Sequence, residues 1–280
     1  MPRHLLPLAL ALTLAACASR TATPQDWPAQ LQQWSAVPLL MLGEQHDAAA
    51  HQDWQQATVK QLADQQRLAA LVIEMAPSTG STATLARDAG EAEVQQALHW
   101  QDAAWPWQRY REVVMSAVRA GVPVLGGNLP RAQMAAAMAD TSYDTHLDAA
   151  GWQRQMDAIR SGHCDLLPQS QWAPMARIQL ARDASMARAA ESAIRHGRTV
   201  VLVAGRGHVL QDIGIASWLT KGVDFRIAIA HPGPRPRDAG ADAHWWESTE
   251  ALPEQDHCAA LRQRFQPKAS STADSARQRP

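Results

Sequence analysis

The sequence predicts an α/β fold: a mostly parallel sheet with flanking helices and a helical insertion. Short, nearly continuous apolar runs alternate with segments of helical character, and such runs are typical of strands buried on both faces of a parallel sheet. Each run is followed directly by polar, often ionisable, residues. The globular part of the chain has the length of one large domain, which we place at residues 27–265.

The strands are assigned to the apolar runs and the helices to the segments between them. The expected strands are Pro38–Leu42, Leu68–Ile73, Val122–Leu125, Thr199–Ala204 and Phe225–Ala230. The expected helical segments are Ala48–Gln66, Arg109–Ala120 and Val209–Leu219. Residues 131–197 depart from this rhythm because they are almost entirely helix-like, with one long helix over Ser170–Gly197 and a break at Pro174. We interpret them as a helical insertion, or lid, over the sheet.

The two ends of the chain differ from its middle in composition. Residues 1–16 combine a positive start, an uncharged apolar stretch and small residues, which predicts a secretory signal; the stretch is too short to span a membrane. Leu14-Ala15-Ala16-Cys17 resembles the bacterial lipobox, so Cys17 is expected to carry the lipid (palmitate among its acyl chains), with residues 17–26 as lipidated start and tether. The alternative is an ordinary signal peptide with a chance cysteine. Residues 266–280 predict a disordered tail.

These ends also predict a location. Ala18, rather than an aspartate, follows Cys17, and this resembles sorting to the outer membrane. We therefore expect a lipid-anchored protein of the cell envelope, facing the periplasm. The net charge of −1 and the lack of a basic block argue against a nucleic-acid partner.

Two cysteines remain if Cys17 is lipidated. In an oxidising compartment Cys164 and Cys258 either form a disulfide or stay as two separate buried thiols, and the sequence leaves both open. No Cys-x-x-Cys spacing is present, which argues against a zinc ribbon or a redox motif.

The candidate site follows from what stands at the strand ends. Gly43-Glu44-Gln45-His46 and Gly205-Arg206-Gly207-His208 repeat one Gly-x-x-His spacing after two separate strands. Ligands of parallel sheets bind outside the carboxyl ends of the strands, so these side chains are expected to converge. The residues that follow the strands are Glu44, His46, Glu74, Asn128, Arg131, Arg206, His208 and His231.

This set of residues permits more than one chemistry. His46, His208 and one carboxylate, Glu44 or Glu74, could ligate a divalent metal, with the other glutamate as the catalytic base of a metal-dependent hydrolase; Glu44 is the proposed ligand. The same side chains could instead bond one another and only fix the loops. A serine hydrolase is not supported, because Gly-x-Ser-x-Gly is absent.

The ordered motifs resemble the ChaN-like haem-binding lipoproteins, part of the wider superfamily of Tiki, TraB and erythromycin-esterase-like proteins. The resemblance covers roughly residues 37–215. Its pieces are Gly43-Glu44-Gln45-His46-Asp47, Val72-Ile73-Glu74-Met75, Trp105-Pro106-Trp107 to Tyr110, Asn128-Leu129-Pro130-Arg131, His163-Cys164 with Leu167-Pro168, Gln179 to Ala187, and Ala204 to Val209.

The resemblance implies haem as the ligand and a part in haem or iron acquisition, with an outer-membrane haem receptor and a second copy of the chain as possible partners. Its Tiki branch implies the alternative, a metal-dependent peptidase that uses the paired Gly-x-x-His motifs and a glutamate. Haem iron takes His, Tyr, Met or Cys ligands, and its propionates pair with arginine. The candidate ligand-binding residues are His46, His208, Arg131, Arg206, Tyr110 and His231, with Arg182 as a further propionate partner. The axial ligand is left open.

Overall fold

The sheet is the frame of the molecule. The computed structural model describes residues 26–34, 36–236 and 242–265. Within them lies one six-stranded sheet in the order β3-β2-β4-β1-β5-β6, and each pair of neighbouring strands is parallel. This confirms the α/β class predicted from the sequence. The strands are β1 (Leu39–Glu44), β2 (Leu68–Pro77), β3 (Val124–Asn128), β4 (Thr199–Gly205), β5 (Phe225–Pro232) and β6 (Trp245–Thr249).

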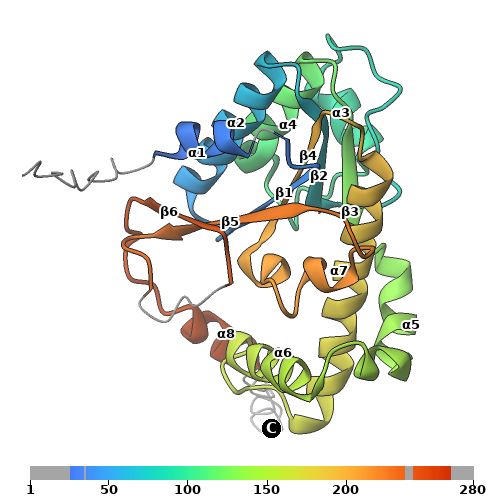
Figure 1. Ribbon diagram of the computed structural model, residues 1–280. Helices are drawn as coiled ribbons and strands as arrows, with labels where there is room; N and C mark the ends of the chain where they lie inside the picture. Colours follow the sequence, from blue (N-terminus) through green and yellow to red (C-terminus); the bar gives the residue numbers. More distant parts are fainter. Residues whose placement is uncertain (1–25, 35, 237–241, 266–280) are drawn as a thin grey trace, which may run out of the picture.

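Helices cover both faces of the sheet (Figure 1). The α-helices of the described residues are α1 (Trp27–Gln33), α2 (Ala49–Asp64), α3 (Glu91–Ala97), α4 (Trp107–Arg119), α5 (Met134–Ala139), α6 (Ala149–Gly162), α7 (Trp172–Ala193) and α8 (His257–Phe265). Short 3₁₀ turns stand between them: η1 (Arg131–Gln133), η2 (Thr141–Thr145), η3 (Gln169–Gln171), η4 (Arg206–Val209) and η5 (Ile215–Trp218).

Two apolar cores lie on opposite faces of the sheet because successive strand residues point to opposite sides. In β1, Leu40 and Leu42 belong to the core shared with α1, α2 and α4. Leu39 and Met41 belong to the core on the other face, shared with α7 and the turns after β4. All four side chains are fully buried, which explains why the strands have continuous apolar sequences.

The strand order places the candidate site. The chain steps from β1 through α2 to β2, and through α3 and α4 to β3; it then returns along α7 on the other face and inserts β4 between β2 and β1. The reversal is a topological switch point, where open parallel sheets bind ligands. The carboxyl ends of β2, β4 and β1 therefore adjoin at the centre of one edge.

The predicted strands are in the observed positions, but they end too early at their carboxyl ends. Four of the strands continue into the polar residues that follow the apolar runs, as β1 does into Glu44. Strand β6 was not expected, because its sequence Trp-Trp-Glu-Ser-Thr is only partly buried at the sheet edge.

The helix predictions need two corrections. The segment expected to be a helix over Val209–Leu219 forms turns η4 and η5 instead; a Cβ on Gly214 would lie 2.2 Å from the carbonyl oxygen of His208, so the chain folds back where a helix would continue. Helix α7 runs unbroken through Pro174. Proline is accepted there because it occupies the first turn, where backbone N–H groups have no helical partner.

Residues 131–197 are helical, as expected, and their longest helix lies against one face of the sheet. Helix α7 packs along β2, β3 and β4 and forms one wall of the second core (Figure 1). Helices α5 and α6 lie outside it, against α7.

The expected signal segment, Cys17, most of the tether and the tail 266–280 lie outside the described residues. Within the described part, none of the helices has the combination of length and apolar character that crossing a bilayer demands.

Candidate functional site

A cavity of about 810 Å³ opens at the carboxyl ends of β1, β2 and β4. The strands themselves supply Glu44, Glu74 and Gly205 to its lining, and His46 and His208 follow β1 and β4 directly. The two Gly-x-x-His segments thus meet at one site, as the sequence predicted for residues that follow neighbouring parallel strands.

The first histidine is held by a carboxylate from its own segment. His46 Nδ1 lies 2.8 Å from Glu44 Oε1, and the buried Glu44 side chain also accepts hydrogen bonds from the Tyr110 hydroxyl at 2.8 Å and from the amides of Gln52 and Gln55, each at 2.7 Å. A carboxylate at Nδ1 orients the ring and leaves Nε2 for the cavity. Burial lowers the pKa of His46, but the bond to Glu44 and the charge of Glu74 outweigh it, so the pKa is raised.

The second histidine is held by a carboxylate from a distant helix. His208 Nδ1 lies 2.5 Å from Oδ1 of Asp183, which projects from the middle of α7 and is 2% exposed. Burial raises the pKa of Asp183 to about 6, even though the neighbouring His208 and Arg182 lower it. Both histidines therefore have a buried carboxylate at Nδ1.

Glu74 lies between the two histidines. Its carboxylate oxygens are 3.8 Å from His46 Nε2 and 3.5 Å from His208 Nε2, and it also accepts hydrogen bonds from Arg182 at 2.5 Å and from the Gly205 backbone N–H at 2.7 Å. Burial alone would raise the pKa of Glu74, but His208, Arg182, His46 and the Gly205 N–H lower it to about 2. The centre of the site is thus a buried, ionised carboxylate.

Gly205 gives the two motifs room to meet. A Cβ at this position would lie 2.8 Å from His46 Nε2 and 3.4 Å from Glu74 Oε2. A side chain here would displace the imidazole, so the glycine of the second motif is required by the histidine of the first.

The cavity walls are mixed in character. The Trp105 ring packs edge-on against His46, with ring centroids 4.8 Å apart, and Ile159, Leu210 and Ile213 add apolar surface. Arg206 is exposed at the lining. Helices α6 and α8 contribute further lining residues: Gln155, Ala158, Ile159 and His257.

The structure gathers some of the predicted site residues and separates others. Glu44, His46, Glu74, Arg206 and His208 line the cavity, together with Arg182. Tyr110 does not line it, because its ring is buried behind Glu44, where burial raises the pKa of the phenol and keeps it a hydrogen-bond donor. Arg131 lies exposed on η1, and His231 lies on β5 beside Trp246, so neither is among the lining residues.

The proposed metal ligands His46, His208 and Glu44 are not arranged as one ligand set. Both oxygens of Glu44 accept hydrogen bonds from protein donors, and His46 turns Nδ1 toward it while Nε2 faces Glu74. Among the described residues no group of three or more His, Cys, Asp or Glu side chains is placed to hold a metal ion.

Sequence reasoning missed Asp183, Gln52 and Gln55, although a signal for each was present. Asp183 lies three residues after Leu180 and four before Ala187, so its charge falls on the buried stripe of an amphipathic helix. Gln52 and Gln55 interrupt the buried stripe of α2 in the same way, ahead of Val59 and Leu62. Charged or amide groups on such stripes need buried partners, which here are His208 and Glu44.

Comparison with known proteins agrees with this fold. The sequence profile of the family described as "Haem-binding uptake, Tiki superfamily, ChaN" matches residues 30–219. The chain therefore belongs to the ChaN family of haem-binding uptake proteins, as the motifs suggested. No curated protein sequence matches it.

One solved structure shows the same fold at low identity, and two more are less similar. ChaN of Campylobacter jejuni, whose structure is described as showing cofacial haem binding, is 20% identical and superposes with a TM-score of 0.62 over 75% of this chain and 88% of that one. The type III effector HopBA1 is 16% identical over 80% and 93% of the two chains, with a TM-score of 0.48. A Bacillus cereus protein is 14% identical over 74% and 68%, with a TM-score of 0.41.

The residues of the cavity fit a haem group by their chemistry. Haem needs an imidazole or similar ligand, apolar walls and cations for its propionates. The cavity offers His46 and His208, the apolar side chains around Ile159 and Ile213, and Arg206 at its exposed margin. Its volume lies within the range of sites that bind cofactors.

Proposed function

We propose that this chain binds haem in the cavity at the carboxyl ends of β1, β2 and β4 and serves haem or iron acquisition at the cell envelope. The observation that carries the proposal is that two imidazoles, each oriented by a buried carboxylate, face one cavity that also holds arginine side chains. Membership of a haem-binding uptake family supports the same ligand.

His46 is the proposed axial ligand. Its side chain is 35% exposed, against 11% for His208, so its ring is the more accessible of the two. A carboxylate at Nδ1 strengthens a ligating imidazole, and Glu44 occupies that position. When bound, haem iron would supply a Lewis-acidic centre for this nitrogen.

The arginines are proposed to pair with the propionates. Arg206 is exposed at the cavity lining, whereas Arg182 is tied to Glu74 and to the Asn128 side chain at 2.9 Å. Arg206 is therefore the better partner, and Arg182 chiefly keeps Glu74 ionised.

The envelope part of the proposal comes from the sequence. A lipid on Cys17 would tether the domain through residues 17–26 to the outer membrane, where a haem receptor and a second copy of the chain are candidate partners. Intact mass of the mature protein would detect the acyl chains, and their loss in Cys17→Ser would support the anchor.

The central test is a haemin titration followed by Soret absorbance, with His46→Ala beside wild type. We expect saturable binding by wild type and a roughly 10- to 100-fold loss of affinity in the variant. His196→Ala is the matched control, since His196 is exposed just before β4, at the opposite edge of the sheet from the site. A non-saturating response of wild type would reject haem binding, and unchanged affinity in His46→Ala would reject this ligand.

A further inference from the structure

The backbone of the first Gly-x-x-His motif has a side-chain partner of its own. The N–H of Gln45, which stands between Glu44 and His46, donates a hydrogen bond of 2.9 Å to Nδ1 of His51. His51 lies in the first turn of α2 and is fully buried. Because this N–H belongs to the peptide that joins Glu44 to Gln45, its bond to His51 limits how the chain turns between the carboxylate and the imidazole that the carboxylate holds.

His51 is held in turn from the edge of the sheet. Its Nε2 lies 3.1 Å from the hydroxyl of Thr249, which donates a hydrogen bond of 3.3 Å to the backbone carbonyl of His231. Thr249 is the last residue of β6, and His231 lies on the neighbouring strand β5. A continuous line of hydrogen bonds therefore connects β5 and β6 with the motif at the end of β1.

The two ends of this line determine which nitrogen of His51 carries the proton. A backbone N–H can only donate, so Nδ1 of His51, which accepts from Gln45, has no proton. A backbone carbonyl can only accept, so the Thr249 hydroxyl donates to it and accepts from Nε2 of His51. Burial is the main reason that the pKa of His51 is lowered, which favours this neutral ring.

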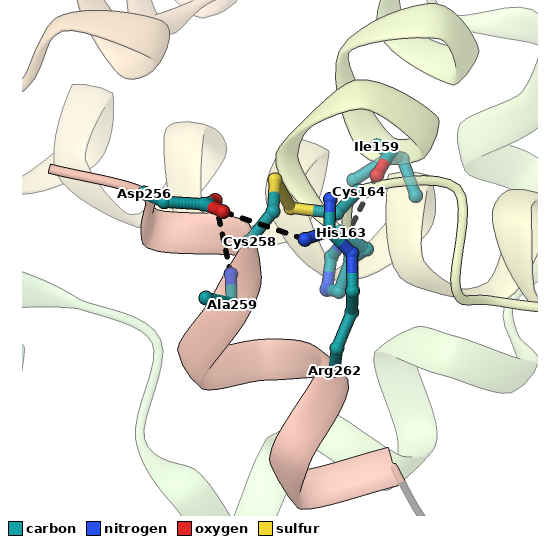
Figure 2. The surroundings of a disulfide bond; sticks show 7 residues. All are labelled: Ile159, His163, Cys164, Asp256, Cys258, Ala259 and Arg262. Carbon is teal, nitrogen blue, oxygen red and sulfur yellow. Dashed lines mark hydrogen bonds and ion pairs between the residues drawn. A yellow bond between two sulfur atoms is a disulfide. The ribbon is translucent and has the colours of Figure 1, made fainter.

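The segment that carries Thr249 is attached on both sides of it. Before Thr249, β6 pairs with β5. After it, Cys258 of α8 is bonded to Cys164, two residues after α6 ends, with an S–S distance of 2.02 Å and the Cα atoms 5.7 Å apart (Figure 2). Of the two alternatives that the sequence left open for these cysteines, the structure has the bridge.

Helix α2 contacts the motif at more than one point. Gln52 and Gln55 donate hydrogen bonds to the carboxylate of Glu44, each at 2.7 Å, and so fix the group that orients His46. His51 acts on the backbone between that carboxylate and its histidine. The side chains of Glu44 and His46 are thus positioned from α2 through both the carboxylate and the main chain.

We propose that His51 is a positioning residue of the haem site: Thr249 keeps its proton on Nε2, so that Nδ1 can hold the Gln45 N–H and thereby aim His46 into the cavity. Groups that orient a metal-binding imidazole affect its affinity without touching the metal. The proposal rests on the proposed function, because it assumes that His46 binds haem.

The first test compares two replacements of His51 in a haemin titration of the full chain. In His51→Asn the side-chain oxygen stands as many bonds from the backbone as Nδ1 does, so it can accept from Gln45. In His51→Gln the amide reaches only the position of Nε2. We expect His51→Gln to lower haemin affinity roughly 10-fold, the lower end of the cost of removing a group that orients a metal ligand.

His51→Asn should bind haemin nearly as wild type does, although it also loses the bond to Thr249. The electron paramagnetic resonance signal of the ferric complex should broaden in His51→Gln only, because His46 then takes more than one orientation. His196→Gln, the same replacement at an exposed histidine, is the matched control and should change neither affinity nor signal.

A second measurement needs no haem. Nitrogen-15 magnetic resonance of the imidazoles in the unliganded chain should show His51 with its proton on Nε2. The signals of the His46 ring should move in His51→Gln and stay in place in His51→Asn. A residue that only stabilises the fold would lower the urea midpoint in both variants and leave the His46 ring as it is in wild type.

The role of Thr249 is tested by a pair of variants that differ in the hydroxyl. Thr249→Val keeps the shape and removes the hydrogen bonds, so the proton of His51 is free to move to Nδ1, where it would prevent acceptance from Gln45. We expect a mixture of the two His51 forms and weaker haemin binding. Thr249→Ser keeps the hydroxyl and should match wild type in both measurements.

The outcomes distinguish this proposal from the proposed function. If wild type does not bind haemin saturably, the proposed function fails, and the nitrogen-15 comparison still decides whether His51 positions His46. If wild type binds and His51→Asn and His51→Gln lose affinity equally, or not at all, the positioning role is overturned while haem binding stands. A proton on Nδ1 of His51 in the wild-type chain would overturn it as well.

Discussion

The two Gly-x-x-His segments share a spacing and differ in where their carboxylates come from. His46 is held by Glu44, two residues before it, whereas His208 is held by Asp183, twenty-five residues before it on α7. Glu44 accepts hydrogen bonds from three further side chains, and Asp183 is paired with its histidine. His46 is also the more exposed of the two rings.

This difference shows that the same Gly-x-x-His motif can take two structural roles. A carboxylate two residues away pairs with its histidine within one segment of the chain, and here that histidine lines the cavity. A carboxylate from a distant helix fixes its histidine only when helix and sheet pack together. The position of the second histidine therefore depends on the packing of α7, and the first histidine presents the more exposed ring.

Removing each of the two carboxylates, Glu44 and Asp183, should have the largest effect on stability. We expect Glu44→Ala to lower the free energy of unfolding by about 3–5 kcal/mol, because buried donors on Tyr110, Gln52 and Gln55 lose their acceptor. Asp183→Ala should cost less, about 1–2 kcal/mol, because burial already disfavours its charge and raises its pKa to about 6. Urea unfolding at pH 7 measures both. Asp47→Ala, at an exposed position in the same segment, should change stability by less than about 0.5 kcal/mol. Equal losses in the two variants would contradict the ranking.

Glu74, which lies between the histidines of both motifs, should determine how the stability of the protein responds to acid. The pKa of Glu74 falls from an ordinary 4.5 to about 2 in the folded protein, so its contribution is fully present above pH 4.5 and is lost as pH falls through 2. The loss should be on the order of 3 kcal/mol. Urea midpoints between pH 7 and pH 2 should fall less steeply in Glu74→Gln than in wild type.

The control for this pH series is Glu250→Gln, which removes one exposed carboxyl that is not among the cavity lining residues. Its acid response should follow that of wild type. If Glu74→Gln also followed wild type, the depressed pKa would be wrong.

The two glycines of the second motif, Gly205 and Gly207, provide the test with the smallest expected effect on stability. Gly205→Ala would place a Cβ 2.8 Å from His46 Nε2, and we expect a loss of about 1–3 kcal/mol in stability together with weaker haemin binding. Gly207, two residues on in the same motif, has open space around the position of a Cβ, so Gly207→Ala should change stability by less than about 0.5 kcal/mol. Thermal unfolding of the two variants side by side measures the contrast, which would disappear if His46 could move aside freely.

The contrast between partners that are close in the chain and partners from other elements explains how much the sequence could predict. The α/β class, the strands and the meeting of His46, His208, Glu44 and Glu74 follow from apolar runs and from the rule that parallel strands end at one edge. Partners that come from other elements, such as Asp183 for His208, depend on how α7 lies on the sheet, and spacing along the chain does not encode that. Strand β6 and helix α8 lack a strong apolar pattern because both lie at the margin of the fold, where burial is partial.

The placement of β4 has a consequence for the order of folding. Strands β1 and β2 come early in the chain, yet neither pairs with the other; each pairs with β4, which starts only at residue 199. The centre of the sheet therefore cannot close until about seven-tenths of the chain has been made, and its closure joins residues more than 120 positions apart. Contacts of such long range slow folding, because the entropy of loop closure is lost before they form. During that interval the facing edges of β1 and β2 stay unpaired, and the arrival of β4 joins them and brings Glu44, Glu74 and Gly205 to one edge before β5 and β6 are added.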